Sequence, residues 1–400
     1  MKKETLLLVT LAFIQFTHIM DFMIMMPLSN LFVDTFHITR AQFGLLVASY
    51  NISAGLVSFL SAFFIDRFDR KKVIVFCYAF FTLGTIACGF APNYEFLLAA
   101  RIFTGMFGGV LSAVILSVVG DSVPLERRAS AMGVVMMGFS AAAILGVPLG
   151  NYAAVHFGWH VPFLALGVLA ILVQFAVFAF IPKMSGHIEE AKKRNPLETI
   201  GAIFTNKNQL LALLLMCVLM GGHFSVIPYI PSFLVSNAHI EQEDITYMYL
   251  VGGLVSVVSL RLIGYCADRF GRFKVFAILS LCATAPLLLI THMGVTPLYI
   301  VLIFTSLFFI FSGGRIVPAN TMITSTALPH QRGGFLSINS AVQQLAGGLV
   351  AWIAGNIITE NPDKSISNYD LVGYIAVGAT LLTIVIAAFI KPVTANGGKK

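Results

Sequence analysis

Ionisable side chains within apolar stretches are the residues of this chain best suited to chemistry. Asp21 stands in a long apolar run, and His18 and Gln15 precede it at intervals of three residues. This spacing puts all three on one face of a helix. A carboxylate in an apolar layer is costly and predicts a functional site, and a histidine can titrate between about pH 5 and 8. We therefore expect Asp21 to carry a proton, with His18 able to share that role.

Arg101 is the predicted partner of Asp21. At about 1.5 Å of rise per helical residue, both lie roughly 8–10 Å below the same boundary of the apolar layer. Their depths are compatible with an ion pair in which Arg101 sets the proton affinity of the carboxyl group. The alternative is a static structural pair, because buried ion pairs are often retained without net stabilisation.

Two further arginines, Arg261 and Arg315, lie in apolar stretches of the second half. Each stands about eighteen residues, or roughly 27 Å of helix, beyond the start of its stretch. No acidic residue lies well inside the stretches of this half to neutralise them. One interpretation is that they attract an anionic or zwitterionic substrate group; the other is that they extend to the inner lipid headgroups.

The elements that position these residues must be membrane helices. The 400 residues are 58% hydrophobic and only 11% charged, whereas a soluble domain carries about 25% charged residues. Soluble enzyme chemistry is excluded, and a span of about 20 apolar residues crosses the bilayer as a helix. The sequence predicts an all-α bundle of twelve transmembrane helices, at 5–33, 41–65, 73–91, 95–120, 129–153, 159–182, 208–236, 244–267, 274–292, 297–327, 333–358 and 368–390.

The distribution of cations predicts the orientation in the membrane. With both termini cytoplasmic, twenty of the 25 Lys and Arg residues fall on the inner side and only Arg40 and Lys364 fall outside, as the positive-inside rule requires. The net charge of +7 therefore reports orientation and needs no nucleic-acid partner. The five cysteines lack metal-ligand spacing, so we expect no metal and no cofactor.

The chain reads as two related halves. The polar segment 183–207 separates a predicted N-terminal six-helix bundle, 1–182, from a C-terminal one, 208–400. A shift of 202 residues places 66–70 on 268–272 and Asp21 on His223, which makes His223 a further candidate for proton coupling. Duplicated six-helix halves are typical of secondary transporters, and the sequence contains no phosphate-binding Gly-x-x-x-x-Gly-Lys-Ser/Thr loop.

The same residues resemble the major facilitator superfamily. The segment 264–272, Gly-Tyr-Cys-Ala-Asp-Arg-Phe-Gly-Arg, is similar to its loop signature, and 98–105 is similar to its fourth-helix arginine motif. The segments 21–27 and 146–150 resemble the twelve-helix drug:proton antiporter branch. The fifth-helix antiporter motif is altered, since Val147-Pro148 replaces its adjacent Gly-Pro.

The resemblance also implies gating loops. Asp66 is expected to approach the start of the eleventh predicted helix, 333–358, near Gly333 and Gly334. Asp268 is expected to approach the start of the fifth predicted helix, 129–153, near Ala129. An anion at a helix N-terminus is stabilised by the helix dipole, so each contact would latch the inner gate. The expected gating residues are Asp66, Arg67, Arg70, Asp268, Arg269 and Arg272.

The first, fourth, seventh and tenth helices line the substrate cavity in the superfamily, which implies candidate lining residues in the predicted helices 5–33, 95–120, 208–236 and 297–327. The second and eleventh predicted helices, 41–65 and 333–358, lie beside them. The candidates are Gln15, His18, Asp21, Met25, Asn51, Arg101, His223, Tyr229, Arg315, Asn320, Asn339 and Gln343.

Three functional hypotheses follow. The first is a proton-coupled exporter of a small amphipathic organic compound, as in multidrug resistance, with Asp21 as the proton carrier and Arg101 as its tuner. The second is an importer or uniporter of an anionic or zwitterionic metabolite or lipid-like molecule. The third is a non-transporting receptor or lipid scramblase. For the first we expect a monomer in the cell inner membrane whose partners are a small-molecule substrate, protons and the lipid bilayer.

Overall fold

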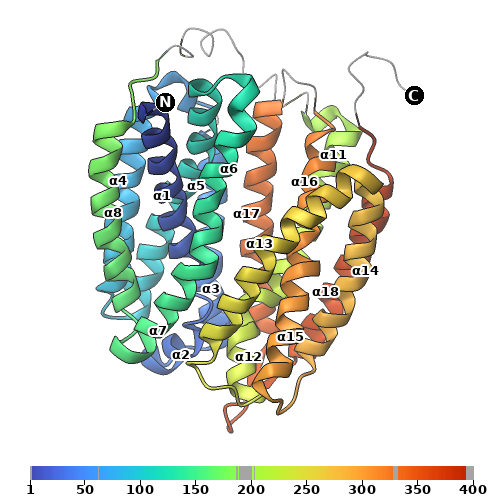
Figure 1. Cartoon of the computed structure of the whole chain (residues 1–400). Helices are drawn as coiled ribbons and strands as arrows, with labels where there is room; N and C mark the ends of the chain where they lie inside the picture. Colours follow the sequence, from blue (N-terminus) through green and yellow to red (C-terminus); the bar gives the residue numbers. More distant parts are fainter. Residues whose placement is uncertain are drawn as a thin grey trace. The chain divides into compact units, whose positions relative to one another are not determined.

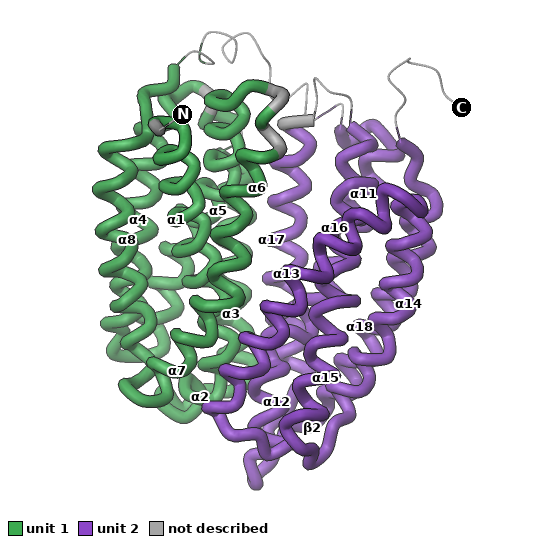
Figure 2. The backbone as a smooth tube through the Cα atoms, viewed as in Figure 1, with its two compact units in different colours: residues 1–195 green, residues 196–400 purple. Residues whose placement is uncertain are grey.

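The chain divides into two units, Met1–Asn195 and Pro196–Lys400, which Figure 2 shows in green and purple. The division falls inside the predicted linker, most of which lies outside the described residues, so the linker boundaries stay a prediction. The computed structural model describes residues 2–61, 63–185, 188, 201, 203–327 and 332–392.

All the secondary-structure elements described in unit 1 are helices (Figure 1). Polar caps begin two of its membrane helices: the Asp69 carboxylate accepts a hydrogen bond from the Lys72 amide at 3.1 Å, and Asn93 accepts one from the Phe96 amide at 2.9 Å. Such caps satisfy backbone donors that have no partner within the helix. The elements are α1 (Lys2–Met23), α2 (Ser29–Phe36), α3 (Arg40–Ser61), η1 (Ile65–Arg67), α4 (Arg70–Gly89), α5 (Tyr94–Ser122), α6 (Leu125–Ala141), η2 (Ala142–Gly146), α7 (Val147–Phe157) and α8 (Val161–Phe180).

Unit 2 repeats this pattern, with one addition. Between its last two long helices, Thr359 and Glu360 pair in antiparallel register with Ser367 and Ile366, a small hairpin that the all-α prediction did not include. The elements are α11 (Lys207–Val226), η3 (Ile227–Tyr229), α12 (Ile230–Asn237), α13 (Ile245–Phe270), α14 (Arg272–Thr291), α15 (Leu298–Phe308), η4 (Phe309–Gly313), α16 (Ile316–Thr324), α17 (Arg332–Ile357), β1 (Thr359–Glu360), β2 (Ile366–Ser367) and α18 (Tyr369–Ala388).

Each of the twelve predicted stretches is helical, so the predicted fold class is confirmed. Eleven helical segments of the described residues are long and apolar enough to cross a membrane. The remaining stretch is α17, which is 26 residues long but carries Asn339, Gln343 and Gln344 among its apolar residues. These polar side chains make it the least apolar of the twelve.

Several predicted helices are interrupted, which hydropathy could not show. The first stretch breaks after Met23 and resumes at Ser29, because Pro27 lacks an amide hydrogen and clashes with the preceding turn. The seventh stretch breaks at Ile227–Tyr229, around Pro228. The fifth and tenth stretches each contain a π-helical turn, η2 and η4. Turns of this kind are frequent at functional sites.

Glycines on α5 allow α3 and α5 to pack closely in unit 1. A methyl group at Gly109 would meet the Ala54 carbonyl oxygen and lie 2.8 Å from the Ala54 Cα atom. One at Gly105 would meet the backbone oxygen of Tyr50. Gly120, near the C-terminal end of α5, has open space where an added methyl group would lie.

We expect Gly109→Ala to lower stability by about 1–3 kcal/mol, because backbone atoms of α3 cannot yield to an added methyl group. Gly120→Ala is the matched control, and should be neutral or stabilising by up to about 1 kcal/mol, since alanine favours the helix. The measurement is the apparent unfolding midpoint of each purified variant in detergent. Equal midpoints for the two variants would contradict close packing of α3 on α5.

Candidate functional site

The structure brings Asp21 and Arg101 together inside unit 1. The Arg101 Nη1 atom lies 2.7 Å from Asp21 Oδ2 and also donates to the Asp21 backbone oxygen at 3.2 Å. The Thr85 hydroxyl donates to the other carboxylate oxygen at 2.9 Å. Both charged side chains are 0% exposed. Helices α1 and α5 therefore supply a buried ion pair, and α4 supplies a hydroxyl that donates to its carboxylate.

The guanidinium of Arg101 keeps hydrogen-bonding capacity beyond this pair. Its Cζ atom lies 4.4 Å from the centroid of the Tyr50 ring, a cation–π distance. Its Nε and Nη2 atoms have no hydrogen-bond partner among the described residues, and neither does the Tyr50 hydroxyl. Buried donors of this kind are costly unless something completes them. Arg101 can therefore hold the Asp21 carboxylate and still donate to water or a ligand.

His18 belongs to the same cluster but does not bond to the pair. Its ring centroid lies 6.3 Å from that of Tyr50 and 5.9 Å from that of Phe81. Both ring nitrogens lack a hydrogen-bond partner among the described residues. Space for the ring depends on Gly108, because a methyl group there would lie 3.0 Å from His18 and 2.5 Å from the Tyr50 hydroxyl.

The other candidates of unit 1 lie near this cluster in sequence. Gln15 is buried, as expected for the face that carries His18 and Asp21. Met25 is fully buried in the break that follows α1. Asn51, next to Tyr50 on α3, is buried with its Nδ2 atom unpartnered among the described residues.

A second polar cluster lies in unit 2, around Arg315. His223 Nδ1 lies 3.3 Å from the Ser312 hydroxyl, and its ring stacks on Phe308 with centroids 5.8 Å apart and planes 5° apart. Arg315 is within electrostatic range of His223. The cluster therefore joins α11 to the π-helical turn η4 and to Arg315, two residues after that turn.

The two unexplained arginines differ, although the sequence suggested the same interpretation for both. Arg261 is exposed on α13, as expected for a side chain that extends to the lipid headgroups. Arg315 is 0% exposed, and its three guanidinium nitrogens have no hydrogen-bond partner among the described residues. Extension to the headgroups is therefore wrong for Arg315.

The remaining cavity candidates of unit 2 occupy different environments. Tyr229 is buried and its hydroxyl donates to the Ala351 carbonyl at 2.7 Å, a bond that anchors η3 to α17. Asn339 is buried with its Oδ1 atom unpartnered among the described residues. Gln343 is half-buried and Asn320 is exposed.

The loop between α3 and α4 is held to the segment that follows α8. Arg70 Nε lies 3.2 Å from Asp121 Oδ2 on α5, and the Arg70 amide donates to the Met184 carbonyl at 3.2 Å. Asp69 accepts from the Met184 amide at 2.8 Å. Asp69 thus forms a local hydrogen bond at the position where the matching segment of the second half, 264–272, has Gly271. Arg67 is exposed.

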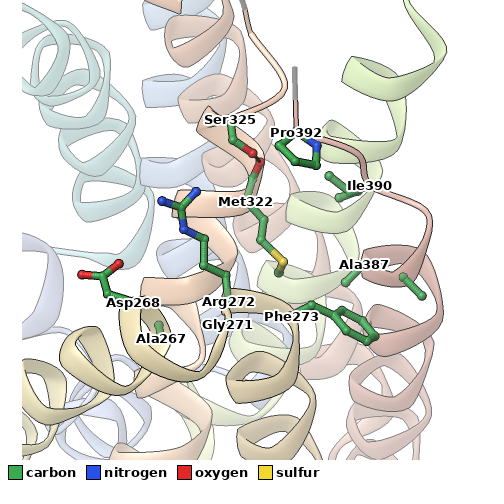
Figure 3. Close-up of a pocket in the computed structure, with 11 residues that line it drawn as sticks. Ala267, Asp268, Gly271, Arg272, Phe273, Met322, Ser325, Ala387, Ile390 and Pro392 are labelled. Atoms are coloured by element: carbon green, nitrogen blue, oxygen red, sulfur yellow. Dashed lines mark hydrogen bonds between the residues drawn. The ribbon is translucent and has the colours of Figure 1, made fainter. Parts of the chain in front are cut away.

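The equivalent loop of unit 2 borders a cavity of about 490 Å³ (Figure 3). Asp268 and Arg272 both line it, and Figure 3 shows no hydrogen bond between them. Arg269 donates to the Tyr265 hydroxyl at 2.9 Å. The predicted latches stay predictions, because the side chains of Asp66 and Ala129 and the surroundings of Gly333 lie outside what the structure describes.

Three contributors were missed at the sequence level: Thr85, Tyr50 and Asp121. Thr85 lies near the end of α4 and Arg101 near the start of α5, so both are close to the loop that connects these helices. Thr85 was missed because only charged residues were compared for their depth in the membrane. Tyr50 has no sequence signal that separates it from other aromatic residues. Among the described residues, no group of three His, Cys, Asp or Glu side chains could hold a metal ion.

Comparison with known proteins decides the family. The sequence profile of the Major Facilitator Superfamily matches residues 11–351 and 262–400. The chain belongs to the major facilitator superfamily. The predicted superfamily is thereby confirmed, and the chain is a multi-pass membrane protein and a secondary transporter, not an enzyme. The drug:proton antiporter branch stays a prediction.

Bacterial relatives cover most of the chain. The uncharacterized MFS-type transporter YbcL of Bacillus subtilis (strain 168) is 26% identical over 352 residues, which are 87% of this chain and 88% of YbcL. The inner membrane transport protein YdhP of Escherichia coli (strain K12) is 25% identical over 354 residues, 88% of each chain. A probable sugar efflux transporter of Mannheimia succiniciproducens is 25% identical over 227 residues, 56% of each chain.

Solved structures share the fold. A D-xylose–proton symporter superposes with a TM-score of 0.78 at 15% identity, covering 97% of this chain and 98% of that one. A bacterial homologue of the human lysosomal transporter Spinster superposes with a TM-score of 0.72 at 16% identity, covering 97% and 95%. At these identities the likeness extends to the fold alone.

Proposed function

We propose that the protein is a proton-coupled exporter of a small amphipathic organic compound that works by alternating access. The observation that carries this proposal is the fully buried Asp21–Arg101 pair with its Thr85 hydrogen bond. A proton-coupled transporter needs a titratable group within its membrane-spanning part, and the buried Asp21 carboxyl is such a group. The probable sugar efflux transporter among the relatives supports export.

The coupling step follows from the charge balance of the pair. Protonation of Asp21 removes the negative charge that holds Arg101, so the contact weakens from a charge-assisted bond to an ordinary one. Arg101 then becomes available to other partners, and deprotonation restores the pair. A proton can shift a conformational equilibrium only by binding its two states differently. Making and breaking this pair supplies that difference.

The remaining parts of the proposal concern the setting. We place the protein in the cell inner membrane as a monomer with both termini cytoplasmic, because that orientation puts twenty of 25 cations inside. The gating role of Asp66, Asp268 and the neighbouring arginines belongs to the same proposal. The Arg70–Asp121 contact at 3.2 Å supports it, because it fixes one gating loop to the end of α5.

Everted membrane vesicles that hold an acidic interior test the proposal. A panel of amphipathic cations, neutral compounds and anions is added, and the internal pH is followed with a fluorescent dye. We expect at least one class to release protons from vesicles that contain the protein and not from vesicles that lack it. Identical traces from both preparations across the whole panel, with the protein folded and present, would refute proton-coupled export.

A further inference from the structure

Arg315 is a buried cation of unit 2 for which the described residues supply no counter-charge. Its side chain is 0% exposed, and Nε, Nη1 and Nη2 all lack a hydrogen-bond partner among the described residues. A buried cation without a counter-charge is strongly unfavourable, and proteins retain one only where something else compensates it. Arg101 shows the contrast, because its carboxylate partner lies 2.7 Å away.

The described part of unit 2 offers no carboxylate to neutralise Arg315. Every acidic residue in its described part lies in a loop, in strand β1 or close to a helix end, and none forms an ion pair with Arg315. These residues are Glu241, Glu243, Asp244, Asp268, Glu360, Asp363 and Asp370. The compensating negative charge must therefore come from outside this unit's own described side chains.

The groups beside Arg315 suit an oxyanion. Ser312 supplies a hydroxyl and His223 an imidazole, and the two are 3.3 Å apart. His223 lies within electrostatic range of Arg315. A guanidinium, a hydroxyl and an imidazole are donors that bind carboxylate or phosphate oxygens. Phe308, stacked against His223, and Phe309 add apolar surface next to these donors.

The backbone at this point is also irregular. The π-helical turn η4, Phe309–Gly313, contains Ser312 and ends two residues before Arg315. A π-turn inserts a residue and rotates the side chains that follow, so η4 determines which way Arg315 points. Without that turn, Ser312 and Arg315 would not keep this relation to α11.

We infer that Arg315, with Ser312 and His223, binds an oxyanionic group of the transported compound, a carboxylate or a phosphate. The inference rests on the proposed function and extends it by naming the substrate class: an amphipathic anion or zwitterion. Proton carriage by Asp21 in unit 1 and anion binding by Arg315 in unit 2 are then separate tasks on separate residues.

Binding to purified protein tests the inference with four naphthalene probes: 2-naphthoate, 2-naphthyl phosphate, neutral 2-naphthamide and cationic 2-naphthylmethylammonium. We expect at least one anion to bind the wild type, and Arg315→Gln to weaken that binding by about 10- to 100-fold, the value of a charge-assisted contact. Arg315→Lys should weaken it less. Arg261→Gln, an exposed arginine of the same unit, is the matched control and should bind normally.

The outcomes separate the two proposals. Failure of both anions to bind the wild type, or equal binding by Arg315→Gln, would overturn the anion site. Binding of either anion identifies carboxylate or phosphate as the favoured group. Anion binding that depends on Arg315, without proton release in the vesicle experiment, would overturn the proposed export and leave the anion site intact.

A second measurement needs no ligand. If Arg315 is retained for binding, Arg315→Met should keep or raise the apparent unfolding midpoint of the ligand-free protein, because it removes an uncompensated buried charge. A midpoint that falls by as much as that of Arg101→Met would assign Arg315 a structural role and overturn the inference.

Discussion

Replacing Arg101 by methionine should destabilise the protein by about 3–5 kcal/mol, because it leaves the Asp21 carboxylate buried without its counter-charge. The pair is 0% exposed on both sides and its Nη1–Oδ2 distance is 2.7 Å. Thr85 alone, with one hydroxyl bond to Oδ1, cannot replace the guanidinium. The measurement is the free energy of unfolding, or the apparent midpoint of thermal unfolding, in detergent.

Two further variants make this result specific. Asp21→Asn combined with Arg101→Met removes both charges and should recover much of the lost stability, since no buried charge remains. Arg127→Met removes a different ion pair, with Glu4 at 3.0 Å, in which the arginine side chain is 57% exposed. Exposed pairs contribute about 0–1 kcal/mol. A midpoint for Arg101→Met close to that of Arg127→Met would contradict a stabilising role for the buried pair.

Asp21→Asn should abolish uphill export while leaving downhill exchange of the same compound. Asparagine keeps the size of the side chain, and its one carbonyl oxygen can still accept from Arg101 while its amide group donates to the Thr85 hydroxyl, but it cannot bind and release a proton. Export driven by a pH gradient should therefore fall to the level of vesicles without protein. Counterflow of labelled compound, which needs no net proton movement, should persist.

Asp34→Asn is the matched control for this variant. Asp34 is an exposed carboxylate on α2 of the same unit, outside the buried cluster, and its loss should leave uphill export unchanged. If Asp21→Asn lost counterflow as well, the residue would be needed for folding or substrate binding. Retention of gradient-driven export by Asp21→Asn would show that another group carries the proton.

Much of the fold could be predicted from hydropathy alone, because lipid allows only helices with satisfied backbone bonds. The interruptions could not. Pro27 and Pro228 are visible in the sequence, but the π-helical turns η2 and η4 depend on packing between neighbouring helices. A scan of average hydropathy does not respond to one extra residue in a turn.

The candidate site was likewise predicted only in part from the sequence. The compatibility of Asp21 and Arg101 followed from helix rise, which fixes depth in the membrane. Depth gives no information about which face of a helix a residue occupies relative to its neighbours. For that reason Arg261 and Arg315 had the same two interpretations, although one is exposed and the other is fully buried.

Proton release from the purified protein tests the central claim most directly. The protein is placed in weakly buffered detergent solution with a pH indicator, and a compound active in the vesicle panel is added without any gradient. We predict that binding releases protons from the wild type and from Asp34→Asn, and none from Asp21→Asn at equal occupancy. Equal proton release by Asp21→Asn would contradict the assignment of Asp21 as the carrier.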